Sequence, residues 1–192
     1  MKHMEKKTTI WILDAAYVFN FSRGHGQIDY MKMKKEIELL NGGPIYETYF
    51  LNSAPEKTSP AQTKFINWLK SAPPMGPKMR VQIYPMKEIT CRCRNCGEES
   101  SRKVQKGVDV GIATLALTLG SKGIYDRLIL TAGDGDFEDA IAHVKSELRK
   151  EVWLNGSQTS LSTDLQSYAD RVIWLETMLN KIRKDDFRAK TA

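Results

Sequence analysis

Residues 10–14 read Ile-Trp-Ile-Leu-Asp, an apolar run that ends on a carboxylate. The run shows no alternation of polar and apolar side chains, which is typical of a parallel strand covered on both faces. We therefore predict a central strand at residues 10–13. Asp14 then stands at the carboxyl end of that strand, where open α/β sheets build their sites.

Short segments rich in β-branched and aromatic residues alternate with helical patterns along the rest of the chain. They predict strands at 46–51, 79–84, 127–131, 151–154 and 171–175. Helices are predicted at 30–40, 61–70, 109–119, 136–149, 162–169 and 175–190. The helix at 109–119 is apolar on nearly every side, so we expect it to be buried. The alternation predicts an α/β fold with a mainly parallel sheet.

Two segments depart from this order. Residues 87–106 are polar and contain all three cysteines, which predicts an insertion between a strand and the apolar helix. Residues 176–192 are predicted to form a charged C-terminal helix or tail. The main domain is then expected to span residues 8–175.

Composition limits the function classes. The 192 residues are 41% hydrophobic and 27% charged, as in soluble globular domains, and one core is expected. No apolar run reaches the ~18–20 residues of a membrane span, so insertion and secretion are disfavoured. The net charge of +6 favours a polyanionic partner. Three clustered cysteines favour the reducing cytoplasm over a secreted disulfide framework. The sequence leaves open whether the protein forms a homo-oligomer.

Four acidic residues are expected at one edge of the predicted sheet. Asp14 follows the first strand, Asp134 and Asp136 follow the strand at 127–131, and Asp109 begins the apolar helix. Clustered carboxylates repel one another, and a divalent cation with oxygen ligands commonly relieves the repulsion. Each acid also has a structural alternative. Asp14 could start a turn, Asp109 could cap or interact with its helix, and Asp136 could be an N-cap with Asp139 near a capping box.

The sequence resembles a known family in four motifs, which occur in the expected order. They are Ile12-Leu13-Asp14-Ala15-Ala16, Lys106-Gly107-Val108-Asp109-Val110, Ala132-Gly133-Asp134-Gly135-Asp136-Phe137 and the segment from Ser162 to Asp170. Together they resemble the NYN domain, particularly its LabA-like branch, within the PIN-like nucleases. The resemblance covers residues 8–175 and implies a Rossmann-like three-layer α/β/α sandwich.

The resemblance also implies a metal-dependent ribonuclease. It places Asp14, Asp109, Asp134 and Asp136 in an acidic site that binds Mg²⁺ or Mn²⁺. The implied reaction is hydrolysis of an RNA phosphodiester, with the metal lowering the pKa of a water molecule. The family commonly has Asn three residues after the first Asp, where this chain has Tyr17. Tyr17 can hydrogen-bond to a substrate there but presents no amide.

The predicted insertion contains candidate ligands of two kinds. Cys91-x-Cys93-x2-Cys96-Gly97 includes half of a zinc-ribbon knuckle, which would take a fourth ligand from His25, His143 or water, and three free thiols are the alternative. The basic residues of the segment could contact RNA phosphates or form a solvated surface, and they are Arg92, Arg94, Arg102, Lys103 and Lys106. His25 is either a contact to the scissile phosphate near Asp14 or an exposed loop residue.

The leading interpretation is a PIN-like ribonuclease. The alternative from another class is a catalytically weak nucleic-acid-binding or regulatory module, which the exchange at Tyr17 favours. A Toprim-type phosphotransfer domain ranks last, because it expects Glu at the position of Asp14.

Overall fold

A six-stranded parallel sheet forms the centre of the molecule in the computed structural model, which describes residues 7–55, 58–92, 94–104 and 107–185. The strand order is β3-β2-β1-β6-β7-β8, and each neighbouring pair is parallel. The strands are β1 (Thr9–Asp14), β2 (Glu47–Ala54), β3 (Arg80–Pro85), β6 (Arg127–Thr131), β7 (Glu151–Gly156) and β8 (Arg171–Trp174). The predicted central strand is confirmed, because β1 lies between β2 and β6.

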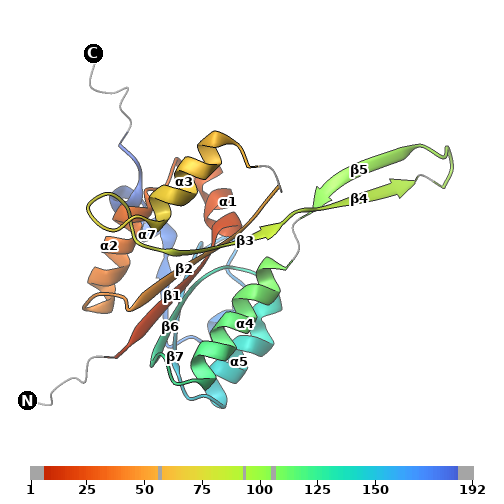
Figure 1. Cartoon of the computed structure of the whole chain (residues 1–192). Coiled ribbons are helices and arrows are strands. Elements are labelled where there is room, and N and C mark those ends of the chain that lie inside the picture. The colour runs from red at the N-terminus through yellow and green to blue at the C-terminus, as the bar shows by residue number, and fades with distance from the viewer. Residues whose placement is uncertain (1–6, 56–57, 93, 105–106, 186–192) are drawn as a thin grey trace, which may run out of the picture.

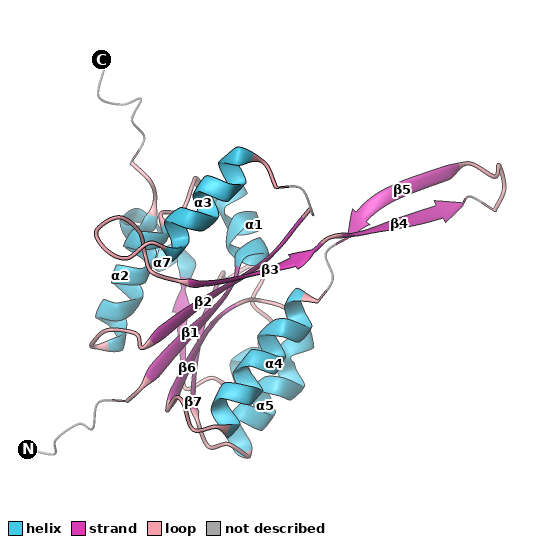
Figure 2. Cartoon of the chain, viewed as in Figure 1, coloured by secondary structure: helices cyan, strands magenta, loops and turns pink. Residues whose placement is uncertain are grey.

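Helices cover both faces of this sheet (Figures 1 and 2). One layer contains α1 (Ala15–His25), α2 (Tyr30–Asn41), α3 (Pro60–Lys70) and α7 (Leu175–Ile182). The other contains α4 (Val108–Ser121), the 3₁₀ turn η1 (Gly135–Phe137), α5 (Glu138–Ser146) and α6 (Thr163–Tyr168). The prediction of a Rossmann-like three-layer sandwich is confirmed.

The central strands supply both cores at once because successive side chains of a strand point to opposite faces. Ile10 and Ile12 pack with the layer of α4 and α5, whereas Trp11 and Leu13 pack with the layer of α1 and α2. All four side chains have no exposed surface. The continuous apolar run therefore reflects a strand with no solvent-facing side.

Several elements differ from the prediction. Residues 15–25, where no helix was predicted, form α1, and the predicted helix at 136–149 is divided into η1 and the shorter α5. The expectation that the 109–119 helix is buried all round is wrong, because Val110 is 69% exposed and only one face of α4 packs on the sheet. The predicted C-terminal helix ends at Ile182, where the chain turns extended at Arg183 and bridges to Ile28. Residues 186–192 lie outside the described residues.

The predicted insertion contains an antiparallel hairpin that projects from the sandwich (Figure 1). Its strands are β4 (Lys87–Arg92) and β5 (Glu99–Val104). It follows the end of β3 and precedes the start of α4, so it leaves the molecule at the carboxyl edge of the sheet. In the described part of the chain, every helix is too short or too polar to cross a bilayer.

A chain of buried hydrogen bonds links four strands of the sheet. The Trp11 indole Nε1 donates to Thr131 Oγ1 (2.8 Å), and Thr131 Oγ1 donates to Asn155 Oδ1 (2.9 Å). Asn155 Nδ2 then donates to the Ile173 carbonyl at 3.0 Å. Trp11, Thr131 and Asn155 are completely buried, so the polar groups of these three side chains that form the network depend on one another for their hydrogen bonds.

We expect Thr131→Val to destabilise the protein, because the isosteric change leaves the Trp11 N–H and the Asn155 amide oxygen without their partner. Each orphaned group should cost about 1–3 kcal/mol in the free energy of unfolding. Thr48→Val is the matched control. Thr48 is 2% exposed, and its hydroxyl has no hydrogen-bond partner in the described structure, so its loss should be neutral or stabilising. Urea unfolding measures both changes, and equal effects would contradict the assigned role of Thr131.

Candidate functional site

The connectivity creates a switch point between β1 and β6. The chain builds outward from β1 through β2 to β3, and then returns to the other side of β1 with β6. The helices that follow these adjacent strands, α1 and η1–α5, consequently lie on opposite faces of the sheet. A crevice forms outside the carboxyl ends of the strands at such a point, and it is the usual ligand site of open α/β sheets.

Asp14 ends β1 at this point and also starts α1. Its Oδ1 accepts hydrogen bonds from the backbone N–H groups of Ala16 (2.9 Å) and Tyr17 (3.4 Å). This N-cap satisfies amides that the first helical turn would otherwise leave unpaired. Oδ2 has no hydrogen-bond partner among the described residues, so one oxygen of a half-buried carboxylate stays available at the strand end.

Asp109 reaches the same edge from α4, whose N-terminus points there. The N-cap of α4 is Gly107, and no side chain forms a capping bond, so the interpretation of Asp109 as the cap is wrong. Gly107 has φ +89°, a left-handed conformation that favours glycine. Asp109 lies exposed in the first turn, where the helix dipole still favours its charge. The Gly in the Lys-Gly-Val-Asp motif thus sets the start of the helix that carries the acid.

Asp134 and Asp136 follow β6 and are both exposed. Asp134 Oδ1 accepts from the Asp136 N–H (3.1 Å) and caps η1. The alternative interpretation of Asp136 as the N-cap is therefore wrong. The Asp136 carboxylate accepts no hydrogen bond from the described residues, which leaves both of its oxygens free.

The charges of the four acids act on one another. Burial raises the pKa of Asp14 above 3.8, and the charges of Asp109 and Asp134 raise it further, against the two backbone hydrogen bonds that lower it. Burial of part of its carboxyl also raises the pKa of Asp109, with Asp134 and Asp136 adding to the effect. The surroundings of Asp14 and Asp109 therefore oppose ionisation of these two carboxyls, and a cation would relieve this.

The acids fit a hydrated cation better than a fully enclosed one. In the described parts of the chain, no three His, Cys, Asp or Glu side chains converge closely enough to hold a metal between them. Mg²⁺ usually keeps several waters and binds through one or two carboxylates together with substrate phosphates. The oxygen donors at the switch point have the chemistry for that mode of binding.

Tyr17 is held in place by contacts within the protein. Its hydroxyl accepts hydrogen bonds from the Ser157 N–H (2.8 Å) and from Ser160 Oγ (3.0 Å), so it ties α1 to the loop after β7. Its ring lies against Gly133, where any β-carbon would clash with the ring and with the Ser160 carbonyl. The Gly before Asp134 is thus required by close packing. Substrate contact by Tyr17 stays a prediction, and its hydroxyl already has two partners.

Tyr30 is a neighbour of the site that the sequence did not indicate. It begins α2, and burial together with the charge of Asp14 raises the pKa of its hydroxyl to about 12. Tyr30 stands sixteen positions after Asp14, and an aromatic residue at the start of a helix belongs to no recognised motif, so no sequence pattern placed it near the acids.

His25 lies at the opposite end of α1 from Asp14. The helix has 11 residues, which places the two roughly 15 Å apart along its axis. The His25 ring stacks on Phe21 with centroids 4.2 Å apart, and its Nδ1 hydrogen-bonds to the Phe21 carbonyl (2.9 Å). The structure therefore does not bring His25 together with the acidic residues.

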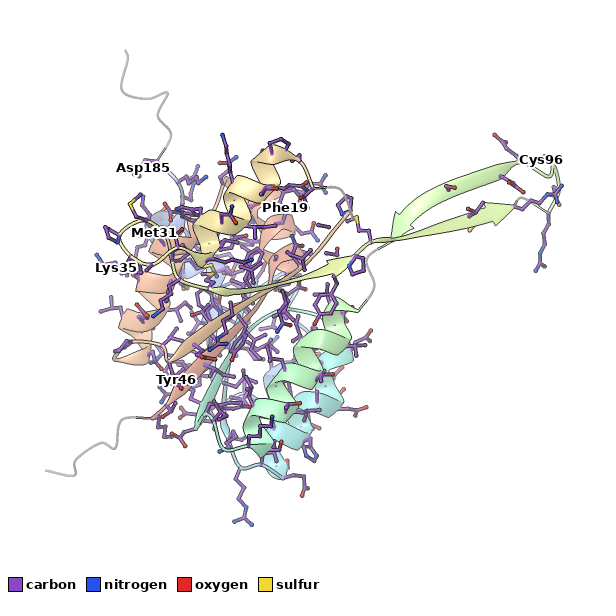
Figure 3. All side chains as sticks on the ribbon, in the orientation of Figure 1. Phe19, Met31, Lys35, Tyr46, Cys96 and Asp185 are labelled. Atoms are coloured by element: carbon purple, nitrogen blue, oxygen red, sulfur yellow. The ribbon has the colours of Figure 1, made fainter. Side chains whose placement is uncertain are left out.

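Those predicted residues of the insertion that the structure describes lie on the hairpin. Cys91 and Cys96 are exposed free thiols, with Cys96 near the tip (Figure 3), and Cys93 lies outside the described residues. Arg92 and Arg94 are exposed, and Arg92 Nε donates to the Gly97 carbonyl (3.3 Å) across the turn. Arg102 and Lys103 are on β5, whereas Lys106 lies outside the described residues.

Comparisons with known proteins agree with this geometry. The sequence matches the NYN domain over residues 7–176. A solved structure of a protein of unknown function from Vibrio parahaemolyticus RIMD 2210633 is similar, with a TM-score of 0.65 and 22% sequence identity, covering 90% of this chain and 96% of that chain. At that identity the likeness shows the fold alone. No curated protein matches the sequence significantly. The chain belongs to the NYN domain family.

Proposed function

We propose that the protein is a metal-dependent ribonuclease that hydrolyses RNA phosphodiester bonds at Asp14, Asp109, Asp134 and Asp136. The observation that carries the proposal is the arrival of these acids at the β1–β6 switch point, where burial and the neighbouring carboxylates raise the pKa of Asp14 and of Asp109. Membership of the NYN family, within the PIN-like nucleases, supports a nucleic-acid substrate. The finer assignment to the LabA-like branch rests on the Lys-Gly-Val-Asp-Val and Gly-Asp-Gly-Asp-Phe motifs, and the proposed location is the cytoplasm.

The acids would hold Mg²⁺ or Mn²⁺, with Asp14 Oδ2 and the free oxygens of Asp136 as the available donors. When bound, the cation supplies an activated water and offsets charge on the phosphate. The protein fixes the positions of the carboxylates. Oδ1 of Asp14 is fixed by two backbone N–H groups, and Asp134 is fixed by its bond from the Asp136 N–H.

The hairpin is proposed as a second contact to the RNA. It leaves the sandwich at the same edge as the acids, and it carries Arg92 and Arg94 into solvent. Arg92 braces the turn through Gly97, whereas Arg94 has no hydrogen bond or ion pair among the described residues. A structural Zn²⁺ bound by Cys91, Cys93 and Cys96 is also proposed, and metal analysis of protein purified without added zinc tests it.

A second candidate function is RNA binding without efficient cleavage. It is favoured by Tyr17, which stands where the family commonly has Asn and whose hydroxyl is engaged by Ser157 and Ser160. Retained RNA binding with no cleavage in Mn²⁺ would identify this function.

We expect RNA cleavage with Mg²⁺ or Mn²⁺ and none in EDTA. Asp14→Asn and Asp134→Asn should each remove it, because an amide keeps the size of the side chain but loses the charge that holds the cation. Asp126→Asn is the matched control, since Asp126 precedes β6 at the other edge and accepts from the Thr8 N–H (2.9 Å), as an amide oxygen also can. Cleavage assays on mixed single-stranded and structured RNAs measure all four proteins. Undiminished cleavage in EDTA would refute the proposal.

We expect Asp109→Asn to stabilise the metal-free protein at pH 7, because it removes one of several repelling charges. A raised pKa means that the folded chain binds this proton more tightly than the unfolded chain. Stability of the parent then falls as the pH rises from 3.8 through the raised pKa. The advantage of the variant should accordingly vanish as the pH falls to that range.

Magnesium provides the complementary measurement. At ten times its dissociation constant, Mg²⁺ should stabilise the parent by about 1.4 kcal/mol and the variant much less. Urea unfolding in EDTA and in Mg²⁺, at constant ionic strength, gives the four values. A less stable metal-free variant with an unchanged Mg²⁺ response would exclude Asp109 from the site.

We expect Arg94→Ala to weaken RNA binding and to reduce its salt dependence. For a single strand, each lost phosphate contact lowers the slope of log affinity against log salt by roughly 0.7. Lys35→Ala, which removes an exposed charge from α2, should leave the slope unchanged. Fluorescence anisotropy at several salt concentrations measures the slopes, and identical values for all three proteins would show that the hairpin does not contact RNA.

A further inference from the structure

A groove of about 560 Å³ opens beside the acidic site, and none of the roles proposed above uses it. It lies between α1, the start of α2, the end of β2 and α3. Its lining includes Phe19, Tyr30, Asn52, Ser53, Phe65 and Lys184. The volume is in the range of pockets that bind small ligands.

The groove and the acidic site share one wall. Ala15 and Ala16 line the groove and directly follow Asp14 in the first turn of α1. Tyr30 lines it as well, and the charge of Asp14 contributes to its raised pKa. A strand whose phosphate lies at the acids therefore has this groove within reach of its neighbouring base.

Aromatic rings form much of its surface. Phe19 is 61% exposed and Phe65 is 38% exposed, although large apolar side chains are costly to leave in water. The centroid of the Phe65 ring lies 5.8 Å from that of Tyr30 and 6.1 Å from that of the buried Phe50, so packing against these two rings holds Phe65 in place. The Phe65 ring also stacks on Trp68 with centroids 5.9 Å apart, and the Arg23 guanidinium lies 5.8 Å from the centroid of the Phe19 ring. Each exposed ring thus offers a planar ligand the face that these neighbours do not cover.

The polar groups of the groove suit a neutral, hydrogen-bonding ligand. Asn20 and Asn52 add amides, which can both donate and accept. Ser53 also lines the groove, but it lies on the same strand face as Tyr49 and Leu51, so its buried side chain points toward the layer of α4 and not into the groove. Among the described lining residues only Lys184 is charged, so the groove lacks the cations that a phosphate pocket needs.

We propose that this groove binds an unstacked nucleobase of single-stranded RNA, next to the phosphate at the acidic site. The proposal rests on the proposed ribonuclease function for its choice of ligand. Phe19 and Phe65 stack on the base, and Asn20 and Asn52 hydrogen-bond to its edge. A paired base in a duplex is not available for this contact without flipping, so the groove selects single strands.

The test measures binding in EDTA, where the proposed cleavage does not occur. The probes are a fluorescein-labelled 12-nucleotide oligoadenylate and a strand of equal length and charge in which abasic ribose replaces the adenosines. Base–aromatic stacking predicts that Phe19→Ala and Phe65→Ala each weaken binding of the first probe roughly fivefold to a hundredfold. Neither change should affect the abasic probe, because the phosphates are identical.

Two further variants separate stacking from structural effects. Tyr46→Ala removes an aromatic ring that is 63% exposed at the far end of the sheet (Figure 3) and should change neither affinity. Phe65→Tyr keeps a stacking face and should retain binding.

Equal losses on both probes, or no loss on either, would overturn the proposal. A shift from dimer to monomer on Phe19→Ala or Phe65→Ala, measured by sedimentation, would instead assign the groove to a second copy of the chain. The outcome is independent of cleavage. Base-dependent binding without cleavage in Mn²⁺ would sustain the groove and refute the ribonuclease, whereas cleavage with base-independent binding would do the reverse.

Discussion

The hydrogen bonds that join Trp11, Thr131 and Asn155 are the constraint on which the geometry of the carboxyl edge of the sheet depends. They run across the sheet from β1 through β6 and β7 to the backbone of β8. Because the three residues are fully buried, a slip of one strand against the next would leave polar atoms unpaired. Strand ends are therefore held level with one another, and Thr131 lies three residues before Asp134. The positions of the acids follow from this register.

The sheet and its acids could be predicted because both depend on local sequence. Apolar runs such as 10–13 identify buried parallel strands, and a polar residue directly after such a run must lie at the carboxyl edge. Strand order is a different matter. The adjacency of β1 and β6, which brings Asp14 to Asp134, joins segments more than a hundred residues apart and has no local signal.

The roles of Asp14 and Tyr17 could not be predicted in full, because each side chain makes contacts that its position in the sequence does not reveal. Asp14 was interpreted as a strand-end acid or a turn residue, yet its Oδ1 starts α1, and that helix carries Phe19 to the groove. The same helix takes His25 away from the acids. Tyr17 was compared with the family Asn by position alone. Its partners Ser157 and Ser160 come from a distant loop, which no spacing in the sequence reveals.

The sheet separates two walls of the site that belong to different cores. Asp109 and Asp134 are carried by segments that pack with α4 and α5, whereas Phe19 and Phe65 are carried by helices of the opposite layer. The strands separate the two buried cores, and Tyr17 of α1 joins the two sides at the edge through Gly133 and Ser160. A substitution within one core, away from Tyr17, can be accommodated with little repacking of the other. The groove residues that we propose to recognise a base can therefore diverge between related chains while the acidic side keeps its geometry.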